Sequence, residues 1–540
     1  MRKLVNIARV LLPVLLLFLS VSGSRAESIF ARYRLPPLDR LQGKTKKLWL
    51  SSMLHKRLQQ IPVSLSQIED TETPDIFHDY LAGILRLSFA KKVVFHGRSI
   101  SELAKFLKKI SPDTVVEVTS PKLIADATLK IPSRIHLKGR KTLITLPKPF
   151  EKPIFLLDGV REVALSGFAF SEVPLGIVVR NSRQIIISDL DFNKGGTAIA
   201  CLERGSRIAL KRIRLRSMEG PGILLQGNLS LVWLRQLDIR DTRRADNGGA
   251  GLVITDASVR FQKSVTIRDI HRITYQALTQ PIYPYMYGPY GILVEENTFA
   301  NNRAQGIYCE GCVGVIIRRN LISGNDKEGI CLDWGSSHNL VLENVIEKNG
   351  FRRRQTDEDL KRDLVLRFGR LADGSAVAKL PGISLDNAAE NIISRNIIRE
   401  NAGDGVKLVR SSFRNIILFN VILHNARGSN HRFAYAGILI GSAGAEPEIM
   451  KLIKAGKFKA PLDYLPSMEN IVAANVIDGE HHWGILLDRD TAYNDIYDNT
   501  VHHQLKEPLA SATKYFNSIV GNSWQIQGKK SLLEKLKAIF

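Results

Sequence analysis

Cysteine is scarce in this sequence, with four in 540 residues. Exported domains that depend on disulfides carry far more cysteine for their length, so a disulfide framework is excluded. Cys309 and Cys312 have the CxxC spacing of a pair that can oxidise after export. The sequence has no second CxxC and no histidine at ligand spacing, so it does not indicate a zinc site.

Long apolar runs are absent beyond the first 26 residues. There, Arg2, Lys3 and Arg9 precede the apolar run Val10–Leu19, and the small residues Ser24 and Ala26 come before a cleavage point after Ala26. This pattern predicts a secretory signal peptide and a periplasmic or secreted mature protein. The run is short for a membrane span, and an uncleaved anchor is the alternative. No transmembrane span is expected once the signal peptide is removed.

Acidic residues are outnumbered, 53 against 76 basic residues, for a net charge of +23. Such an excess favours polyanionic partners such as acidic polysaccharide, lipopolysaccharide or anionic lipid. Export argues against nucleic acid. A generally basic, solvated surface is the alternative.

A six-residue unit, Asn-apolar-apolar-x-x-Asn, recurs through the second half of the chain. Its successive copies are 23, 24, 52, 24, 55 and 24 residues apart, so the long steps are two periods that contain inserted residues. The copies begin at Asn297, Asn320, Asn344, Asn396, Asn420, Asn475 and Asn499. A second Asn-apolar unit precedes most of them, and a Gly-Ile unit follows, at Gly291, Gly306, Gly329, Gly382, Gly405, Gly437 and Gly484.

Three short alternating segments in each period of about 23 residues predict a coil of three strands. Coils must stack about 4.8 Å apart to bury their apolar faces. The sequence therefore predicts an all-β solenoid, a right-handed parallel β-helix, over residues 121–508. Asparagine suits its corners because it tolerates a left-handed backbone and can form side-chain ladders between coils.

The flanking segments are predicted to close the two ends of this solenoid. Residues 27–120 form a basic region with a capping helix, which starts at the capping box Ser99-x-x-Glu102 and carries Ile100, Leu103 and Leu107 on one face. Residues 509–540 form a C-terminal cap, with a short helix at a Leu-Leu-x-x-Leu pattern.

On these repeats, the run from about Leu129 to Gln504 resembles the pectate-lyase-like β-helix superfamily, in particular its carbohydrate-binding and sugar-hydrolase repeats. The superfamily includes polysaccharide lyases, glycoside hydrolases, uronan epimerases and periplasmic accessory proteins of the NosD type. The resemblance implies a β-helix that acts on or binds polysaccharide. The Asp-Pro-His-Asp, Gly-His-Gly and Arg-x-Pro-x-x-Arg motifs of its epimerases, polygalacturonases and pectate lyases are missing, so no catalytic residue is carried over.

The fourth residue after the glycine of the Gly-Ile unit is repeatedly acidic, and strand alternation places it on the outer face. These residues are Glu295, Glu310, Asp333, Asp386 and Asp488. Glu310, Asp333 and Asp386 are expected on successive coils, because residues 350–381 read as an insertion. Carboxylates so close need a proton, a partner or a cation, so we predict catalytic acids at the spacing of a glycosidase pair. Ca²⁺ ligands or turn caps are the alternatives; no other cofactor is indicated.

Cations and aromatic residues surround the predicted acids. Lys407 faces outward on the next coil as a further catalytic candidate, able with Arg410 beyond it to neutralise a uronate. The predicted substrate-binding residues are Tyr308, Trp334, Arg410, Asp488, and Tyr285 and Tyr287 of the insertion 271–290. Exposed aromatic rings give platforms for sugars, although the Tyr-Pro segment can instead pack on the solenoid wall. The insertions 271–290, 350–381, 426–436 and 442–467 are expected to border a groove.

Two functions remain open from the sequence. The first is a monomeric lyase, glycoside hydrolase or uronan epimerase that acts on an acidic polysaccharide. The second is a carbohydrate-binding or envelope-assembly protein without catalysis. Accessible carboxylates at Glu310, Asp333 and Asp386 would favour the enzyme, and carboxylates buried beneath loops would weaken it.

Overall fold

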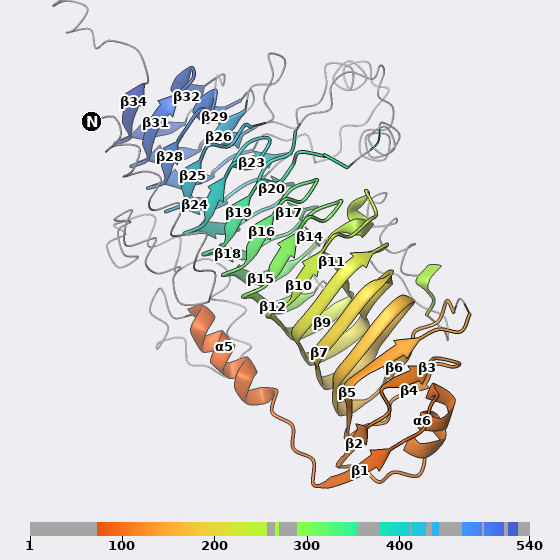
Figure 1. Cartoon of the computed structure of the whole chain (residues 1–540). Helices are drawn as coiled ribbons and strands as arrows, with labels where there is room; N and C mark the ends of the chain where they lie inside the picture. Colours follow the sequence, from red (N-terminus) through yellow and green to blue (C-terminus); the bar gives the residue numbers. More distant parts are fainter. Residues whose placement is uncertain are drawn as a thin grey trace, which may run out of the picture.

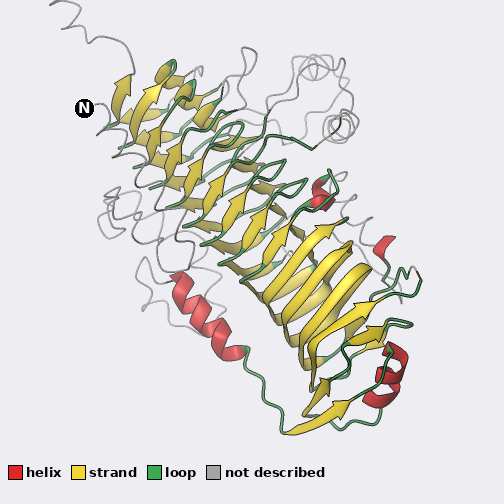
Figure 2. Ribbon diagram, in the orientation of Figure 1, coloured by secondary structure: helices red, strands yellow, loops and turns green. Residues whose placement is uncertain are grey.

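The computed structural model describes residues 73–148, 150–255, 265–268, 289–354, 356, 379–410, 412–427, 435–441, 467–488, 491–511 and 517–526. In these residues the strands pair in parallel, coil after coil, into one elongated solenoid (Figures 1 and 2). The predicted β-helix is confirmed. The signal peptide, residues 27–72 and the predicted C-terminal helix lie outside the described residues.

Each coil contributes one strand to each of three sheets. The first sheet carries the Gly-Ile units and consists of β6 (Phe155–Asp158), parts of β7 (Arg161–Met218), β8 (Ile223–Gln226), β11 (Leu252–Thr255), β14 (Ile307–Glu310), β17 (Ile330–Asp333), β20 (Ile383–Asp386), β23 (Val406–Val409), β26 (Ala436–Ile440), β29 (Trp483–Leu487) and β32 (Glu507–Ser511).

The other two sheets carry the two kinds of asparagine unit. The second sheet consists of part of β7, β9 (Asn228–Arg235), β12 (Tyr290–Glu295), β15 (Val313–Arg318), β18 (Leu340–Leu342), β21 (Ile392–Ser394), β24 (Ile416–Leu418), β27 (Ile471–Ala473), β30 (Asp495–Tyr497) and β33 (Ser518–Val520). The third consists of part of β7, β10 (Asp238–Arg240), β13 (Thr298–Ala300), β16 (Leu321–Ser323), β19 (Val345–Glu347), β22 (Ile397–Arg399), β25 (Val421–Leu423), β28 (Val476–Asp478), β31 (Thr500–Gln504) and β34 (Ser523–Ile526).

The inward residues of successive coils are branched apolar side chains in exact register. In the first sheet Ile307, Ile330, Ile383 and Val406 pair in sequence and are fully buried. One coil cannot bury such a row by itself, but its neighbours on both sides remove the row from water. Stacking of the repeated apolar strand residues therefore forms the hydrophobic core.

Three ladders of buried asparagines run along the corners of the solenoid. Each Oδ1 accepts two bonds from the asparagine of the preceding coil: Asn320 Oδ1 accepts the backbone N–H of Asn297 at 3.0 Å and its Nδ2–H at 2.9 Å. The second Nδ2–H of Asn297 reaches the Leu234 carbonyl at 3.1 Å. The same pattern continues through Asn344, Asn396, Asn420, Asn475, Asn499 and Asn522. The predicted ladder is confirmed, and its amides are satisfied as buried polar groups must be.

The left-handed corner residue was predicted wrongly. The asparagines of the ladders were expected to adopt the positive φ, but the residue before each of them does so, as at Glu296 (φ 55°), Arg319 (53°) and Glu343 (56°). Such residues carry a strain of about 1–3 kcal/mol, which the ladder bonds of the following asparagine offset. The charged side chains at these positions point outward and pair between coils, as Arg319 does with Glu343 at 2.9 Å.

The N-terminal end is closed by helix α6 (Ile100–Leu107), as predicted (Figure 1). Ser99 Oγ accepts the Glu102 N–H at 3.2 Å, and Ile100, Leu103 and Leu107 are buried against the core. The parallel stack extends beyond the predicted bounds 121–508 at both ends. It begins at β1 (Lys91–Phe95) and β2 (Thr114–Val118), continues through β3 (Lys122–Ile124), β4 (Leu129–Lys130) and β5 (Ile135–Thr145), and reaches β34.

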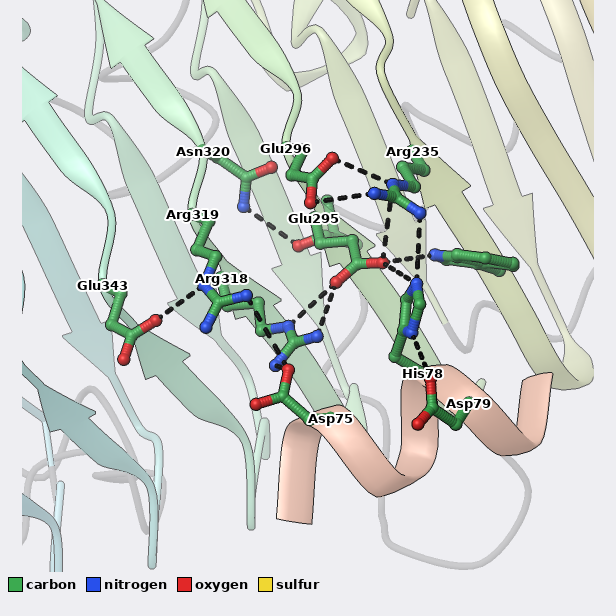
Figure 3. A network of polar contacts seen from close by, with 12 residues as sticks. Asp75, His78, Asp79, Arg235, Glu295, Glu296, Arg318, Arg319, Asn320 and Glu343 are labelled. Carbon is green, nitrogen blue, oxygen red and sulfur yellow. Dashed lines mark hydrogen bonds and ion pairs between the residues drawn. The ribbon is translucent and has the colours of Figure 1, made fainter. Parts of the chain in front are cut away.

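Helix α5 (Thr73–Ile84) lies along the outer face of the second sheet (Figures 1 and 3). Beneath it, the fully buried carboxylate of Glu295 accepts Trp233 Nε1–H at 2.8 Å and Arg318 Nε–H at 2.9 Å. Arg318 also donates to Asp75 of the helix at 2.7 Å. Glu295 was predicted to belong to the acidic row of the Gly-Ile strands. It lies in β12, in another sheet, where its role is to hold α5.

Candidate functional site

The outer face of the first sheet changes character along the solenoid. At the second residue after each glycine it is apolar and buried from β8 to β17, in a cluster that includes Leu224, Val253 and Cys331 and on which Val265 packs. Val265 comes from the insertion after β11, which returns toward the N-terminal coils, where the Ile267 N–H donates to the Glu151 carbonyl at 3.0 Å. Beyond β17 the same outward positions become polar, at Ser384 and Lys407. At this position β26, β29 and β32 carry Leu439, Leu486 and Ala510, so the polar pair is confined to β20 and β23.

The predicted acidic row exists in the expected register. Glu310 pairs with Asp333, and Asp333 with Asp386, at the ends of β14, β17 and β20. The direct pairing of β17 with β20 places these two strands on successive coils. Thr255 precedes the row and Val409 follows it.

The carboxylates of this row are buried, whereas an open groove would leave them exposed. Glu310, Asp333 and Asp386 are 1%, 6% and 8% exposed. Glu310 Oε2 accepts the Thr255 hydroxyl at 3.3 Å. Asp333 accepts the Tyr308 hydroxyl at 3.3 Å and the Trp334 N–H at 3.0 Å. These bonds stabilise the acids as parts of the wall, so Glu310 and Asp333 are poorer catalytic candidates than their spacing suggested.

Of the three acids, Asp386 is the one with an ion pair to an arginine. Its Oδ2 lies 3.3 Å from Arg410 Nη1, while its buried Oδ1 has no hydrogen-bond partner. Lys407, half-buried, stands on the next strand in register with Ser384. A buried carboxylate oxygen without a donor is costly and calls for a hydrogen bond from outside the wall. The structure therefore narrows the candidate site to Asp386, Arg410 and Lys407.

The predicted substrate-binding residues differ in how far they are exposed. Tyr308 is 1% exposed and packs in the apolar cluster with Val253 and Cys331, so it is no platform for a sugar. Its outward position was right, but other side chains cover it. Trp334 is half-buried at a left-handed corner (φ 42°), beside Asp333. Asp488 is half-buried three strands beyond Asp386, where its N–H donates to the Ile440 carbonyl at 2.9 Å. Tyr285 and Tyr287 lie outside the described residues.

Sequence reasoning missed two ionisable residues, Asp404 and Tyr435, which lie just before the Gly-Ile strands β23 and β26. Asp404, just before β23, is 3% exposed and accepts the Ala436 N–H at 2.7 Å. Burial raises the pKa of this carboxyl to about 6, although the nearby charge of Lys407 opposes the shift. The Tyr435 hydroxyl accepts the Lys379 N–H at 2.8 Å, and burial raises its pKa to about 12. Asp404 precedes a Gly-Ile-type strand as Glu328 does, which is a signal that a search of the strand ends alone overlooks.

The cysteines are free and buried, so the CxxC pair is not a disulfide. Cys309 points into the core, and Cys312 Sγ donates to the Ile254 carbonyl at 3.5 Å. Within the described part of the chain no group of three or more His, Cys, Asp or Glu residues is arranged to hold a metal ion.

The sequence comparison agrees with the fold. A family model described as a right-handed beta helix region matches residues 284–450. The chain carries a right-handed parallel β-helix. No curated protein matches it.

Solved structures similar to this β-helix include three that differ widely in origin. The A-module of mannuronan C-5 epimerase AlgE4 from Azotobacter vinelandii is 14% identical (TM-score 0.46), with 79% of this chain and 100% of that chain covered. The GH87 α-1,3-glucanase of Streptomyces thermodiastaticus is 10% identical (0.47), with 80% and 68% covered. Tailspike protein 3 of bacteriophage CBA120 is 9% identical (0.46), with 91% and 70% covered. At these identities the likeness concerns the fold, and no residue role is carried over from them.

Among the described residues, no helix has the length and apolar character needed to cross a membrane.

Proposed function

We propose that this β-helix protein acts on an acidic polysaccharide, as a lyase, hydrolase or epimerase, at the outer face of β20 and β23. The observation that carries the proposal is Asp386: one carboxylate oxygen pairs with Arg410 and the other is buried without a donor. A sugar hydroxyl at that oxygen would supply the missing hydrogen bond. The strong positive charge of the chain favours an anionic glycan over a neutral one.

The neighbouring side chains supply the chemistry that such a substrate needs. Arg410 and Lys407 can neutralise a uronate carboxylate, which makes the adjacent C–H bond more acidic. Asp404, whose buried carboxyl has a pKa of about 6, lies five residues before Val409, the residue paired with Asp386, and so belongs to the other end of β23. Chain cleavage by elimination, hydrolysis and epimerisation all require a proton to be removed or delivered beside such a cation.

The second candidate is carbohydrate binding without catalysis. It is favoured by the burial of Glu310 and Asp333, whose carboxylates are bonded to neighbours in the wall. A binding protein would retain the glycan and yield no product.

The deciding experiment incubates the protein with uronic-acid and neutral polysaccharides, with and without Ca²⁺. New reducing ends indicate hydrolysis, absorbance of unsaturated uronate indicates elimination, and a changed uronate composition by NMR indicates epimerisation. Retention on immobilised glycan without any of these products supports binding alone. Absence of both product and retention across the panel refutes the proposal.

Variants then test the site itself. Asp386→Asn keeps the size of the side chain but removes its charge, and activity should fall at least 100-fold while the fold persists. Asp333→Asn should have a smaller effect, because Asp333 is bonded within the wall. Asp189→Asn is the matched control: this carboxylate also pairs with an arginine, Arg212 at 2.6 Å, but in the N-terminal coils. Unchanged activity in Asp386→Asn would remove Asp386 from the site.

We also propose that the protein is exported to the periplasm or secreted, is cleaved after Ala26 and is a monomer. The basic n-region, the short apolar run and the small residues before the cleavage point support the export. N-terminal sequencing of the mature protein should begin at Glu27. An intact N-terminus on exported protein would indicate an anchor instead.

A further inference from the structure

The two ends of the solenoid carry opposite charge. The segment from β1 to β5, residues 91–145, contains 12 basic and four acidic residues. At the other end, the described residues from 467 to 526 contain seven acidic residues and one basic residue, Lys506. Figure 1 shows these two regions at opposite ends, with α6 on the basic one. The β-helix is therefore electrically polarised along its axis.

Most of the positive charge at the N-terminal end is not paired. Eleven of the 12 basic side chains are exposed, and Arg134 is half-buried. Glu117 pairs with Lys92 and Arg140, each at 2.8 Å, and Asp113 accepts a bond from Arg134. Within the described part of the chain the other nine form no ion pair: Lys91, Arg98, Lys105, Lys108, Lys109, Lys122, Lys130, Lys138 and Lys141.

These cations surround the end of the solenoid and do not line one face of it. Lys138 in β5 continues the second sheet, Lys122 in β3 the third, and Lys130 in β4 the first. Lys105 and Lys109 lie on the exposed side of the cap helix α6. A linear glycan would need such charges in a row along a single face. A planar anionic surface meets all of them when the end of the solenoid approaches it.

The length of the solenoid favours contact through this end. Three coils at about 4.8 Å occupy about 10 Å, which is close to one Debye length at physiological ionic strength. All of the basic coils therefore act on a surface that touches α6. Seven successive strand pairings separate β9 from β30, a distance of about 34 Å. The acidic coils thus lie several Debye lengths away and do not oppose the contact.

Two exposed apolar side chains accompany the charges. Val94 in β1 and Ile124 in β3 are 41% and 42% exposed, and they are two of only seven large hydrophobic residues exposed in the described part of the chain. Both lie in strands of the first two coils. Apolar side chains beside lysines are the combination that binds the interface of an anionic membrane.

We propose that the basic N-terminal end of the β-helix docks on an anionic lipid surface, with its lysines on the headgroup phosphates and the solenoid axis pointing away. The charge polarity turns the molecule into this orientation as it approaches. The proposal is independent of the proposed function. In this orientation β20 and β23 lie many coils from the lipid.

The test measures flotation of the full chain with vesicles of phosphatidylcholine, either alone or mixed with phosphatidylglycerol. The variant Lys105→Gln/Lys109→Gln/Lys122→Gln removes three charges from the N-terminal end. Hydrogen exchange of the α6 and β31 amides reports which end contacts the vesicle.

Two further variants separate the surface from net charge and from folding. Arg353→Gln/Arg427→Gln/Lys506→Gln is the matched control, because it removes three exposed charges from later coils. Lys138→Gln/Lys141→Gln alters β5 and leaves α6 unchanged, so it keeps the test decisive if the first variant loses its cap helix.

The full chain should bind the anionic vesicles and not the neutral ones, and more weakly as salt rises. Each basic residue near such a surface strengthens binding about fivefold, so the first variant should bind about 100-fold more weakly and the β5 variant about 25-fold. The control should bind as the native chain does. Exchange should slow in α6 on the vesicles and stay the same in β31.

Equal binding to the two kinds of vesicle would overturn the proposal, as would equal losses in the two triple variants. Soluble polygalacturonate provides the competing outcome. If it binds, the vesicles do not, and its binding is lost in Lys105→Gln/Lys109→Gln/Lys122→Gln, the basic end is a glycan site and the lipid proposal is wrong.

Discussion

His481 lies at a ladder position that asparagine occupies in the earlier coils. Its replacement tests how much the ladder contributes to stability. In earlier coils the asparagine at this corner accepts two bonds, as Asn425 Oδ1 does from Asn401 at 3.1 and 2.8 Å. In the last step Asn425 donates its backbone N–H to His481 Nε2 at 3.1 Å. That nitrogen accepts only while it is unprotonated. His481 is fully buried, and burial lowers its pKa from 6.5 to about 3.

The depressed pKa makes stability depend on pH. Above pH 6.5 the histidine is neutral in both the folded and the unfolded state, so its full contribution to the free energy of unfolding is present. As pH falls from 6.5 toward 3, the unfolded chain binds a proton that the folded chain excludes. The free energy of unfolding then falls by about 1.4 kcal/mol per pH unit, or about 2.7 kcal/mol by pH 4.5. Asparagine does not titrate and can accept the second bond from Asn425.

We therefore expect His481→Asn to stabilise the protein by about 1 kcal/mol at pH 7.5 and by about 3–4 kcal/mol at pH 4.5. Urea unfolding midpoints at one-unit steps of pH measure the difference, in which all other titrating groups cancel. His96→Asn, at an exposed residue just after β1, is the control substitution. Parallel slopes for the native protein and His481→Asn would refute the reasoning.

Three further predictions concern other buried polar groups. Asn396→Ala removes the acceptor of two bonds from Asn344 and should lower the free energy of unfolding by about 3 kcal/mol in urea titrations, whereas the exposed Arg427→Ala should change it little. Asp404→Asn should stabilise the protein by about 3 kcal/mol at pH 7 and have little effect below pH 4, because a raised carboxyl pKa costs stability as pH rises from 3.8 to 6; equal effects at both pH values would contradict this. Asp75→Asn should speed hydrogen exchange in α5 by weakening its contact with Arg318; Asp79→Asn, at an 82% exposed side chain, is the control.

The repeat was sufficient to predict the stacking of particular residues. Asparagine spacing located the corners, and the Gly-Ile units put Glu310, Asp333 and Asp386 on successive strands. Both follow from a period of one coil, which local sequence records directly. The left-handed residue of each corner was predicted one position too late in the chain. Asparagine favours a positive φ, but in these corners its side chain forms the ladder, and the residue before it adopts the positive φ.

The composition of the candidate site could not be predicted in this way. Tyr308 and Lys407 hold equivalent outward positions on the same sheet, yet one is buried in an apolar cluster and the other is half-buried among polar groups. Glu295 follows a Gly-Ile unit as Asp386 does, but its strand belongs to a different sheet and lies under α5. Asp404 acquires its raised pKa from burial alone.

The amino-acid sequence by itself thus determined the coil, its period and the direction of each strand residue, since these depend on neighbours one coil away. The tertiary structure decided which outward residues remain available for chemistry, because α5 and residues 265–268 come from distant parts of the chain to cover parts of the outer faces. The repeat pattern does not indicate which outer faces other segments will cover. The candidate site was therefore reduced from a row of acids to the surroundings of Asp386.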